Sequence, residues 1–131
     1  MPSKNFPESV RQLIFDHIDS VELLEVLLFL RLHSGRRCTS DMISAELRSN
    51  PQSVSNRLNA LADSGLVQRE EGDFIYSSKN ESLDNSVALL AELYKVRRHK
   101  ILELIFSPLK KGRYFAEAFV VMPPKKDSDN D

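Results

Sequence analysis

Residues 50–67 constrain the fold of this chain more than any other stretch, because they carry both the start and the stop signals of a short helix. Asn50 can cap the amino terminus of that helix, and Pro51 fits its first position, where no backbone N–H is required. Gly65 follows at the place where a glycine in the left-handed conformation commonly ends a helix. The apolar residues between these signals recur at helical spacing and form one stripe: Val54, Leu58 and Leu61. The segment therefore predicts a helix that rests one face on a core and shows the other face to solvent.

The solvent face of this predicted helix is rich in small amides and hydroxyls, which can bond to the edges of DNA bases. Asn and Gln in particular can pair bidentately with adenine. A solvated helix surface is the alternative interpretation of the same face. Arg57, on the flank of the apolar stripe, and Arg48, just before the helix, are candidate phosphate contacts, with surface ion pairs as the alternative. The candidate DNA-binding set is Gln52, Ser53, Ser55, Asn56, Arg57, Asn59 and Arg48.

The neighbouring segments predict a helix-turn-helix followed by a β-hairpin. Apolar residues at helical spacing predict further helices over residues 7–18, 21–32 and 41–47. Asp19 and Glu22 resemble a capping box at the start of the second of these helices, and Thr39 or Ser40 can cap the third. Two short strands, with a tight turn at 70–73 between them, are predicted over residues 66–69 and 74–76. The expected fold class is mainly α with a small β-hairpin, a winged helix-turn-helix with a long carboxyl-terminal helix.

That long helix is predicted over residues 82–106 and carries an apolar seam at heptad-like spacing, which Arg97 interrupts. The seam can pack on its own domain or on a second subunit, and it supplies the candidate dimerisation residues Val87, Leu90, Tyr94, Ile101 and Leu104. The same helix holds the densest positive charge in the chain. Cations there can approach phosphates or an acidic partner, with a solvated charged face as the alternative interpretation. The candidates for such contacts are Arg97, Arg98 and Lys100.

The chain divides into four regions by pattern and composition. An arm and a helix occupy residues 1–18, and the winged helix-turn-helix domain occupies 19–77. A helical dimerisation region is expected over 82–121, with a last short helix over 112–121. Residues 122–131 are rich in Pro, Lys and Asp, which predicts a disordered tail.

Composition limits the class of protein. The formal net charge is −1, so the whole chain lacks the basic balance typical of nucleic-acid binders. The single cysteine, Cys38, excludes a disulfide within one chain, and no leader or membrane-length apolar run is visible, so a cytoplasmic protein without membrane contact is expected. His17, His33 and His99 are isolated, and no set of nucleophile and base is evident, so no metal, cofactor or enzymatic activity is predicted.

One motif resembles a known family. Ser53-Val54-Ser55-Asn56-Arg57-Leu58-Asn59-Ala60-Leu61, followed by Gly65-Leu66-Val67-Gln68-Arg69, is similar to the recognition helix and wing of MarR-like winged helix-turn-helix transcriptional regulators. The resemblance covers residues 21–76. It implies a dimer, formed through the helices at 7–18 and 82–106, that places one recognition helix per subunit in duplex DNA. The tip Glu70-Glu71-Gly72-Asp73 departs from the family, whose wing commonly carries Arg or Lys.

Three functional hypotheses follow. The first is a dimeric, DNA-binding transcriptional regulator. The second is a winged-helix module that binds a protein instead of DNA, which the acidic wing favours. Residues 35–76 support the second, since five arginines against six carboxylates give them a formal charge of −1. The third is a regulator that senses a ligand in a pocket between the winged helix and the carboxyl-terminal helix.

Overall fold

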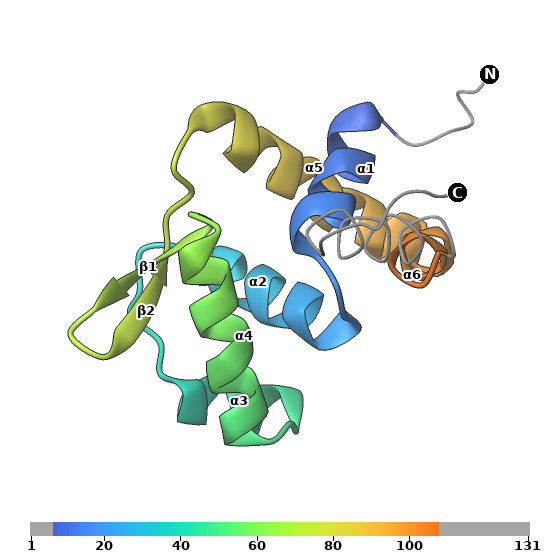
Figure 1. Ribbon diagram of the computed structural model, residues 1–131. Helices are drawn as coiled ribbons and strands as arrows, with labels where there is room; N and C mark the ends of the chain where they lie inside the picture. The colour runs from blue at the N-terminus through green and yellow to red at the C-terminus, as the bar shows by residue number, and fades with distance from the viewer. Residues whose placement is uncertain (1–6, 108–131) are drawn as a thin grey trace, which may run out of the picture.

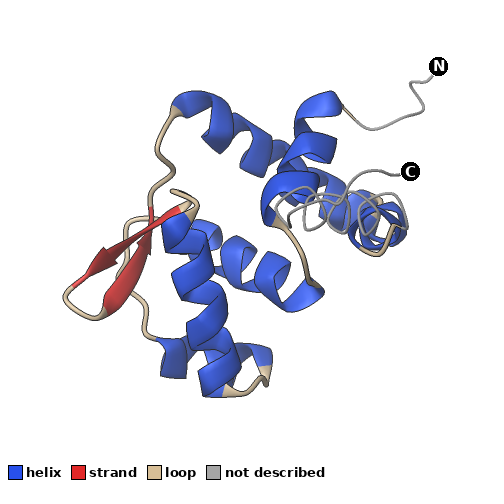
Figure 2. Cartoon of the chain, in the orientation of Figure 1, coloured by secondary structure: helices blue, strands red, loops and turns tan. Residues whose placement is uncertain are grey.

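The computed structural model describes residues 7–107, which form six helices and one two-stranded antiparallel hairpin. Figures 1 and 2 show two groups of elements: α1, α5 and α6 on one side, and α2, α3, α4 and the hairpin on the other. The elements are α1 (Glu8–His17), α2 (Val21–Leu32), α3 (Ser40–Leu47), α4 (Pro51–Asp63), β1 (Val67–Glu70), β2 (Asp73–Tyr76), α5 (Glu81–Val96) and α6 (Arg98–Ile105). The predicted arm at 1–6, the short helix at 112–121 and the tail at 122–131 lie outside these residues. The winged helix-turn-helix expected from the sequence is confirmed.

Helix α2 lies at the centre of the winged domain and contacts α3, α4 and β2. Its apolar side chains point to several sides, as expected for a helix surrounded by protein. The buried ones are Leu23, Leu24, Val26, Leu27 and Leu30. At 12 residues, α2 has the highest mean hydropathy of the helices, but no helix within 7–107 combines the length and the apolar character needed to cross a membrane.

The two ends of α4 form as their local signals predict. The side-chain oxygen of Asn50 accepts a hydrogen bond of 3.0 Å from the backbone N–H of Ser53, and Pro51 occupies the first position. At the other end Gly65 has φ +85°. The N–H of Leu66 donates to the carbonyl of Leu61, and the N–H of Gly65 donates to the carbonyl of Ala62. These are the two bonds of a Schellman motif.

The wing is a short hairpin in which Glu70 pairs with Asp73. Its turn consists of Glu71 at φ 53° and Gly72 at φ 88°, a pair of left-handed residues that suits a two-residue hairpin loop. Strand β1 is shifted by one residue from the predicted strand at 66–69, and β2 begins one residue before the predicted strand at 74–76. The free edge of β2 is partly covered, because Cys38 exchanges two backbone hydrogen bonds with Phe74, at 2.8 and 2.9 Å.

The helix predicted over 82–106 is divided, which corrects the sequence interpretation. At Arg97 the backbone has φ −137° and ψ 46°, so α5 ends and α6 begins there. A continuous helix would place Arg97 in line with the buried seam, where its charge would lose hydration. The break leaves Arg97 exposed, while Ile101 and Ile105 of α6 still reach the core. Helix α1 packs against both α5 and α6.

The capping box predicted at Asp19 and Glu22 is also wrong. Ser20 is the capping residue, and its hydroxyl accepts a bond of 3.1 Å from the N–H of Leu23. Asp19 lies one position too early to serve, and it is exposed. The carboxylate of Glu22 is thereby available for contacts outside α2.

Candidate nucleic-acid interface

The outer face of α4 presents three amides to solvent: Gln52, Asn56 and Asn59. The amide nitrogen of Gln52 donates to the side-chain oxygen of Asn56 at 3.2 Å, and that of Asn59 donates to the carbonyl of Ser55 at 3.0 Å. These bonds lie at the surface, where water or a ligand can replace them at small cost. The side chains therefore form a row along about two turns of an exposed helix.

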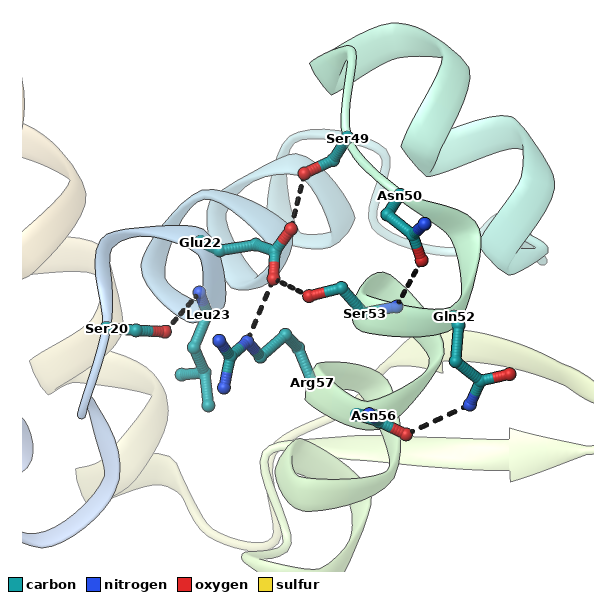
Figure 3. Close-up of polar contacts among 9 residues, drawn as sticks. All are labelled: Ser20, Glu22, Leu23, Ser49, Asn50, Gln52, Ser53, Asn56 and Arg57. Atoms are coloured by element: carbon teal, nitrogen blue, oxygen red, sulfur yellow. Dashed lines mark hydrogen bonds and ion pairs between the residues drawn. The ribbon is translucent and has the colours of Figure 1, made fainter.

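Ser53 and Arg57, which the sequence analysis places among the DNA contacts, lie instead on the flank that faces α2 (Figure 3). The hydroxyl of Ser53 and Nε of Arg57 both donate to Oε1 of Glu22, the latter at 3.0 Å. The hydroxyl of Ser49, in the turn before α4, donates to Oε2 of the same carboxylate. Both side chains donate toward α2, and their role as DNA contacts stays a prediction. Ser55 is half-buried.

The carboxylate of Glu22 is held in its charged form by these donors. Hydrogen bonds from Ser49 and Ser53 lower its pKa below the ordinary value, and Arg57 adds to the effect against an opposing contribution from burial. The side chain of Glu22 is 21% exposed and that of Arg57 is 33% exposed. The pair is thus shielded from water more than the other ion pairs found between residues 7 and 107.

Arg69 of the wing, and Arg37 of the segment between α2 and α3, are paired with carboxylates. Arg37 lies 3.1 Å from Glu70 and 3.7 Å from Glu71. Arg69 lies 3.0 Å from Asp63, and its Nε also donates to the side-chain oxygen of Asn59 at 3.0 Å. Sequence reasoning missed both sets of contacts. The arginine and two glutamates at 69–71 are charged groups that need partners, but those partners lie on other elements.

Arg48 forms the turn between α3 and α4 in the left-handed conformation, with φ 57°. Its side chain is exposed at the amino-terminal side of α4, where a phosphate contact would be geometrically open.

The predicted cluster of cations lies at the junction of α5 and α6, and α6 is at the opposite side of the molecule from the hairpin (Figure 1). Its cations have acidic neighbours: Arg98 lies 3.6 Å from Glu25, and Lys100 lies 3.3 Å from Glu103. Arg97 is exposed at the break between α5 and α6. The structure therefore does not bring Arg97, Arg98 and Lys100 together with the amides of α4.

The residues of the predicted dimerisation seam differ in how deeply they are buried. Val87, Leu90 and Ile101 have no exposed surface and belong to the core of a single chain, and their role in a subunit interface stays a prediction. Tyr94 and Leu104 are partly buried against the same core. The hydroxyl of Tyr94 also donates to Glu25 at 3.1 Å, and its ring lies 4.6 Å beneath the guanidinium of Arg98.

An open groove of about 420 Å³ runs between α1 and the start of α5. Polar residues dominate its lining, including Gln12, His17, Lys79 and Ser82. Burial lowers the pKa of His17, against a raising effect of Asp16. No residue of α2, α3 or α4 lines this groove, so it differs from the pocket that the third hypothesis requires.

Among solved structures, the chain is similar to a MarR family protein of Mycobacterium tuberculosis. The two sequences are 13% identical, the alignment covers 88% of this chain and 87% of that chain, and the TM-score is 0.46. No protein-family model matches the chain, and no curated protein is significantly similar to it in sequence. The geometry of α4 and its neighbours, rather than this likeness, supports the function proposed below.

Proposed function

We propose that this chain is a cytoplasmic, dimeric winged-helix transcriptional regulator that inserts α4 into the major groove of duplex DNA. In a helix-turn-helix the second helix carries the base-reading side chains, and α4 follows α3 after a short turn in that order. The proposal separates the residues of α4 into two groups, the outward amides that read bases and the inward donors that hold the helix.

The observation that carries this proposal is the exposed row of Gln52, Asn56 and Asn59. Amide side chains carry one acceptor and two donor hydrogens in one plane, which matches the edge of adenine in the major groove. The row stands on a helix with both ends capped and with α2 and α3 behind it. Such a base is rigid enough to present the amides in fixed register.

The charge distribution shapes the expected affinity. Phosphate contacts supply most of the sequence-independent binding, and Arg48 is the cation best placed beside α4. Arg37 and Arg69 can contribute only by exchanging their carboxylate partners for phosphates. We therefore expect weak binding to random DNA and a large share of the affinity from base contacts.

The dimer that we propose uses exposed rather than buried apolar groups. Leu89 and Val96 lie seven residues apart on one face of α5, with exposed fractions of 38% and 75%. Phe106, at the end of α6, is 56% exposed. Large apolar groups of this kind gain free energy when a second surface covers them.

The test of DNA reading is a binding selection from random duplexes followed by titration of the enriched site. Asn56→Ala and Asn59→Ala should each weaken binding to that site by about 1–3 kcal/mol and leave binding to random duplex nearly unchanged. Asn85→Ala is the matched control, because Asn85 is an exposed amide on α5. A selection that enriches no motif, together with unchanged affinities in both variants, would remove the proposal.

One observation favours a second function, a module that binds a protein. The wing carries Glu70 and Glu71 at its tip, and these carboxylates would repel a phosphate backbone while attracting a basic protein surface. A selection that enriches no DNA motif would therefore favour this protein-binding function.

A further inference from the structure

We propose that Glu22 is the positioning residue of the recognition helix, fixing the rotation of α4 about its own axis so that its amides face the DNA. This inference rests on the function proposed above and deepens it. It assigns a role in sequence discrimination to a residue of α2 that itself lies outside the base-reading face.

The contacts of Glu22 span three consecutive parts of the helix-turn-helix (Figure 3). Ser49 lies in the turn, Ser53 in the first turn of α4 and Arg57 in the next turn. Ser53 and Arg57 are four residues apart, so they share one flank of α4, and both donate to Oε1. Oε2 accepts from Ser49, so a single carboxylate fixes both the entry of the chain and the direction of the helix.

These bonds add a directional constraint to the apolar packing of α4. Val54, Leu58 and Leu61 are fully buried and determine which face of α4 meets the core, although the hydrophobic effect itself has no direction. Hydrogen bonds to a carboxylate are directional and, with a charged donor, about twice as strong as neutral ones. The Glu22 contacts therefore add directional bonds on one flank of α4 to the packing of its apolar stripe.

The amplitude of such a rotation decides whether it affects recognition. The outer side chains of a helix lie about 5–6 Å from its axis, so a turn of about 20° displaces them by about 2 Å. A donor–acceptor distance in a good hydrogen bond varies by only about 0.5 Å. A rotation of about 20° is thus large enough to separate Gln52, Asn56 and Asn59 from base edges.

The test compares wild type, Glu22→Gln and the matched control Glu25→Gln by measuring affinity for the selected duplex and for random duplex. Glu25 lies on the same helix and loses the same charge in its variant, but its partners Tyr94 and Arg98 belong to α5 and α6. Glu22→Gln should lower the ratio of the two affinities by about tenfold, comparable to one bidentate base contact. Affinity for random duplex should hold or rise, because Arg57 is released. Glu25→Gln should keep the wild-type ratio.

A loss of folding would lower both affinities together, and circular dichroism would reveal it. Ser53→Ala then provides the measurement, because it removes one donor without leaving an unpaired charge, and it should lower the ratio by about threefold, roughly 0.7 kcal/mol. A ratio unchanged within twofold in folded Glu22→Gln would overturn the positioning role.

Failure of the proposed function would be visible separately, as a wild-type protein that shows no preference among duplexes. The position of α4 is then read without DNA, from amide hydrogen exchange. Glu22→Gln should reduce the protection of the backbone amides of residues 54–58 at least tenfold relative to Glu25→Gln. Equal protection in the two variants would show that the apolar stripe alone holds α4, and the inference would fail.

Discussion

At the scale of single residues, Gly65 shows how one position can join two elements. Its φ of +85° closes α4 and turns the chain into β1. Its carbonyl also accepts a hydrogen bond of 2.9 Å from the N–H of Lys79, just before α5. A Cβ at this position would lie 2.6 Å from the Cδ of Lys79. The residue therefore has a backbone reason to lack a side chain, while the exposed and flexible Lys79 side chain can move aside.

We predict that Gly65→Ala destabilises the protein by about 1–2 kcal/mol, because a left-handed conformation is costly for any residue with a Cβ. Urea unfolding measures the change. In a Lys79→Ala background the same substitution should cost nearly the same, because the exposed Lys79 side chain can move aside and the backbone hydrogen bond is kept in both backgrounds. Equal stability of Gly65→Ala and wild type would contradict the role given to this glycine.

At the scale of elements, the predictable features are those that depend on near neighbours in sequence. Asn50, Pro51 and Gly65 act within four residues of the groups that they cap, so the limits of α4 follow from the sequence. Glu22 meets donors 27, 31 and 35 positions away, and no local pattern specifies where α2 crosses α4. The distinction between outward and inward polar residues of α4 therefore required the arrangement in space.

The seam of α5 and α6 illustrates a different limit. Apolar spacing identified Val87, Leu90 and Ile101 as packed, but periodicity does not reveal which surface covers a seam. Helix α1 covers it here, in contact with both helices. No glycine or proline marks the break at Arg97. The helix ends there because a continuous helix would place the charged Arg97 side chain in line with the buried apolar seam.

We predict that one variant of these helices lowers the stability of the fold and that another disrupts the proposed dimer without affecting stability. Ile101→Ala should destabilise the fold by roughly 2–5 kcal/mol, because it opens a cavity in the core. Val96→Glu should change stability by less than about 0.5 kcal/mol, since Val96 is 75% exposed, yet it should convert the proposed dimer to a monomer. Thermal unfolding and sedimentation measure the two effects. Wild-type protein that sediments as a monomer at tens of micromolar, roughly the range of a weak contact, would contradict the dimer.

At the scale of the whole molecule, acid should weaken the fold in two stages. His17 has an ordinary pKa of 6.5 that folding lowers, and Glu22 has an ordinary pKa of 4.5 that folding also lowers. In both cases the unfolded chain takes up the proton at a higher pH than the folded chain does. Stability is therefore lost as the pH falls below 6.5 through His17, and again below 4.5 through Glu22.

We predict that denaturant unfolding followed from pH 8 to pH 3 shows both losses of stability. A separate substitution should remove each loss. His17→Gln should flatten the first stage only, and Glu22→Gln should flatten the second only, since neither glutamine titrates. His17 lies on α1 and Glu22 lies on α2, and the two side chains have different partners, so their effects on stability should add. A first stage that persists in His17→Gln would assign it to another group.

The backbone bridge between Cys38 and Phe74 has a consequence for how this protein can meet other chains. A sheet normally offers two borders to which a foreign strand can be added, and unprotected borders promote aggregation. Here one border is already occupied at its middle by the segment that leads into α3. The other border belongs to β1, where Gln68 and Arg69 are exposed and disfavour the approach of an apolar strand. Strand exchange between copies should therefore be rare, and a partner that extends the wing by β-augmentation has only the β1 side open to it.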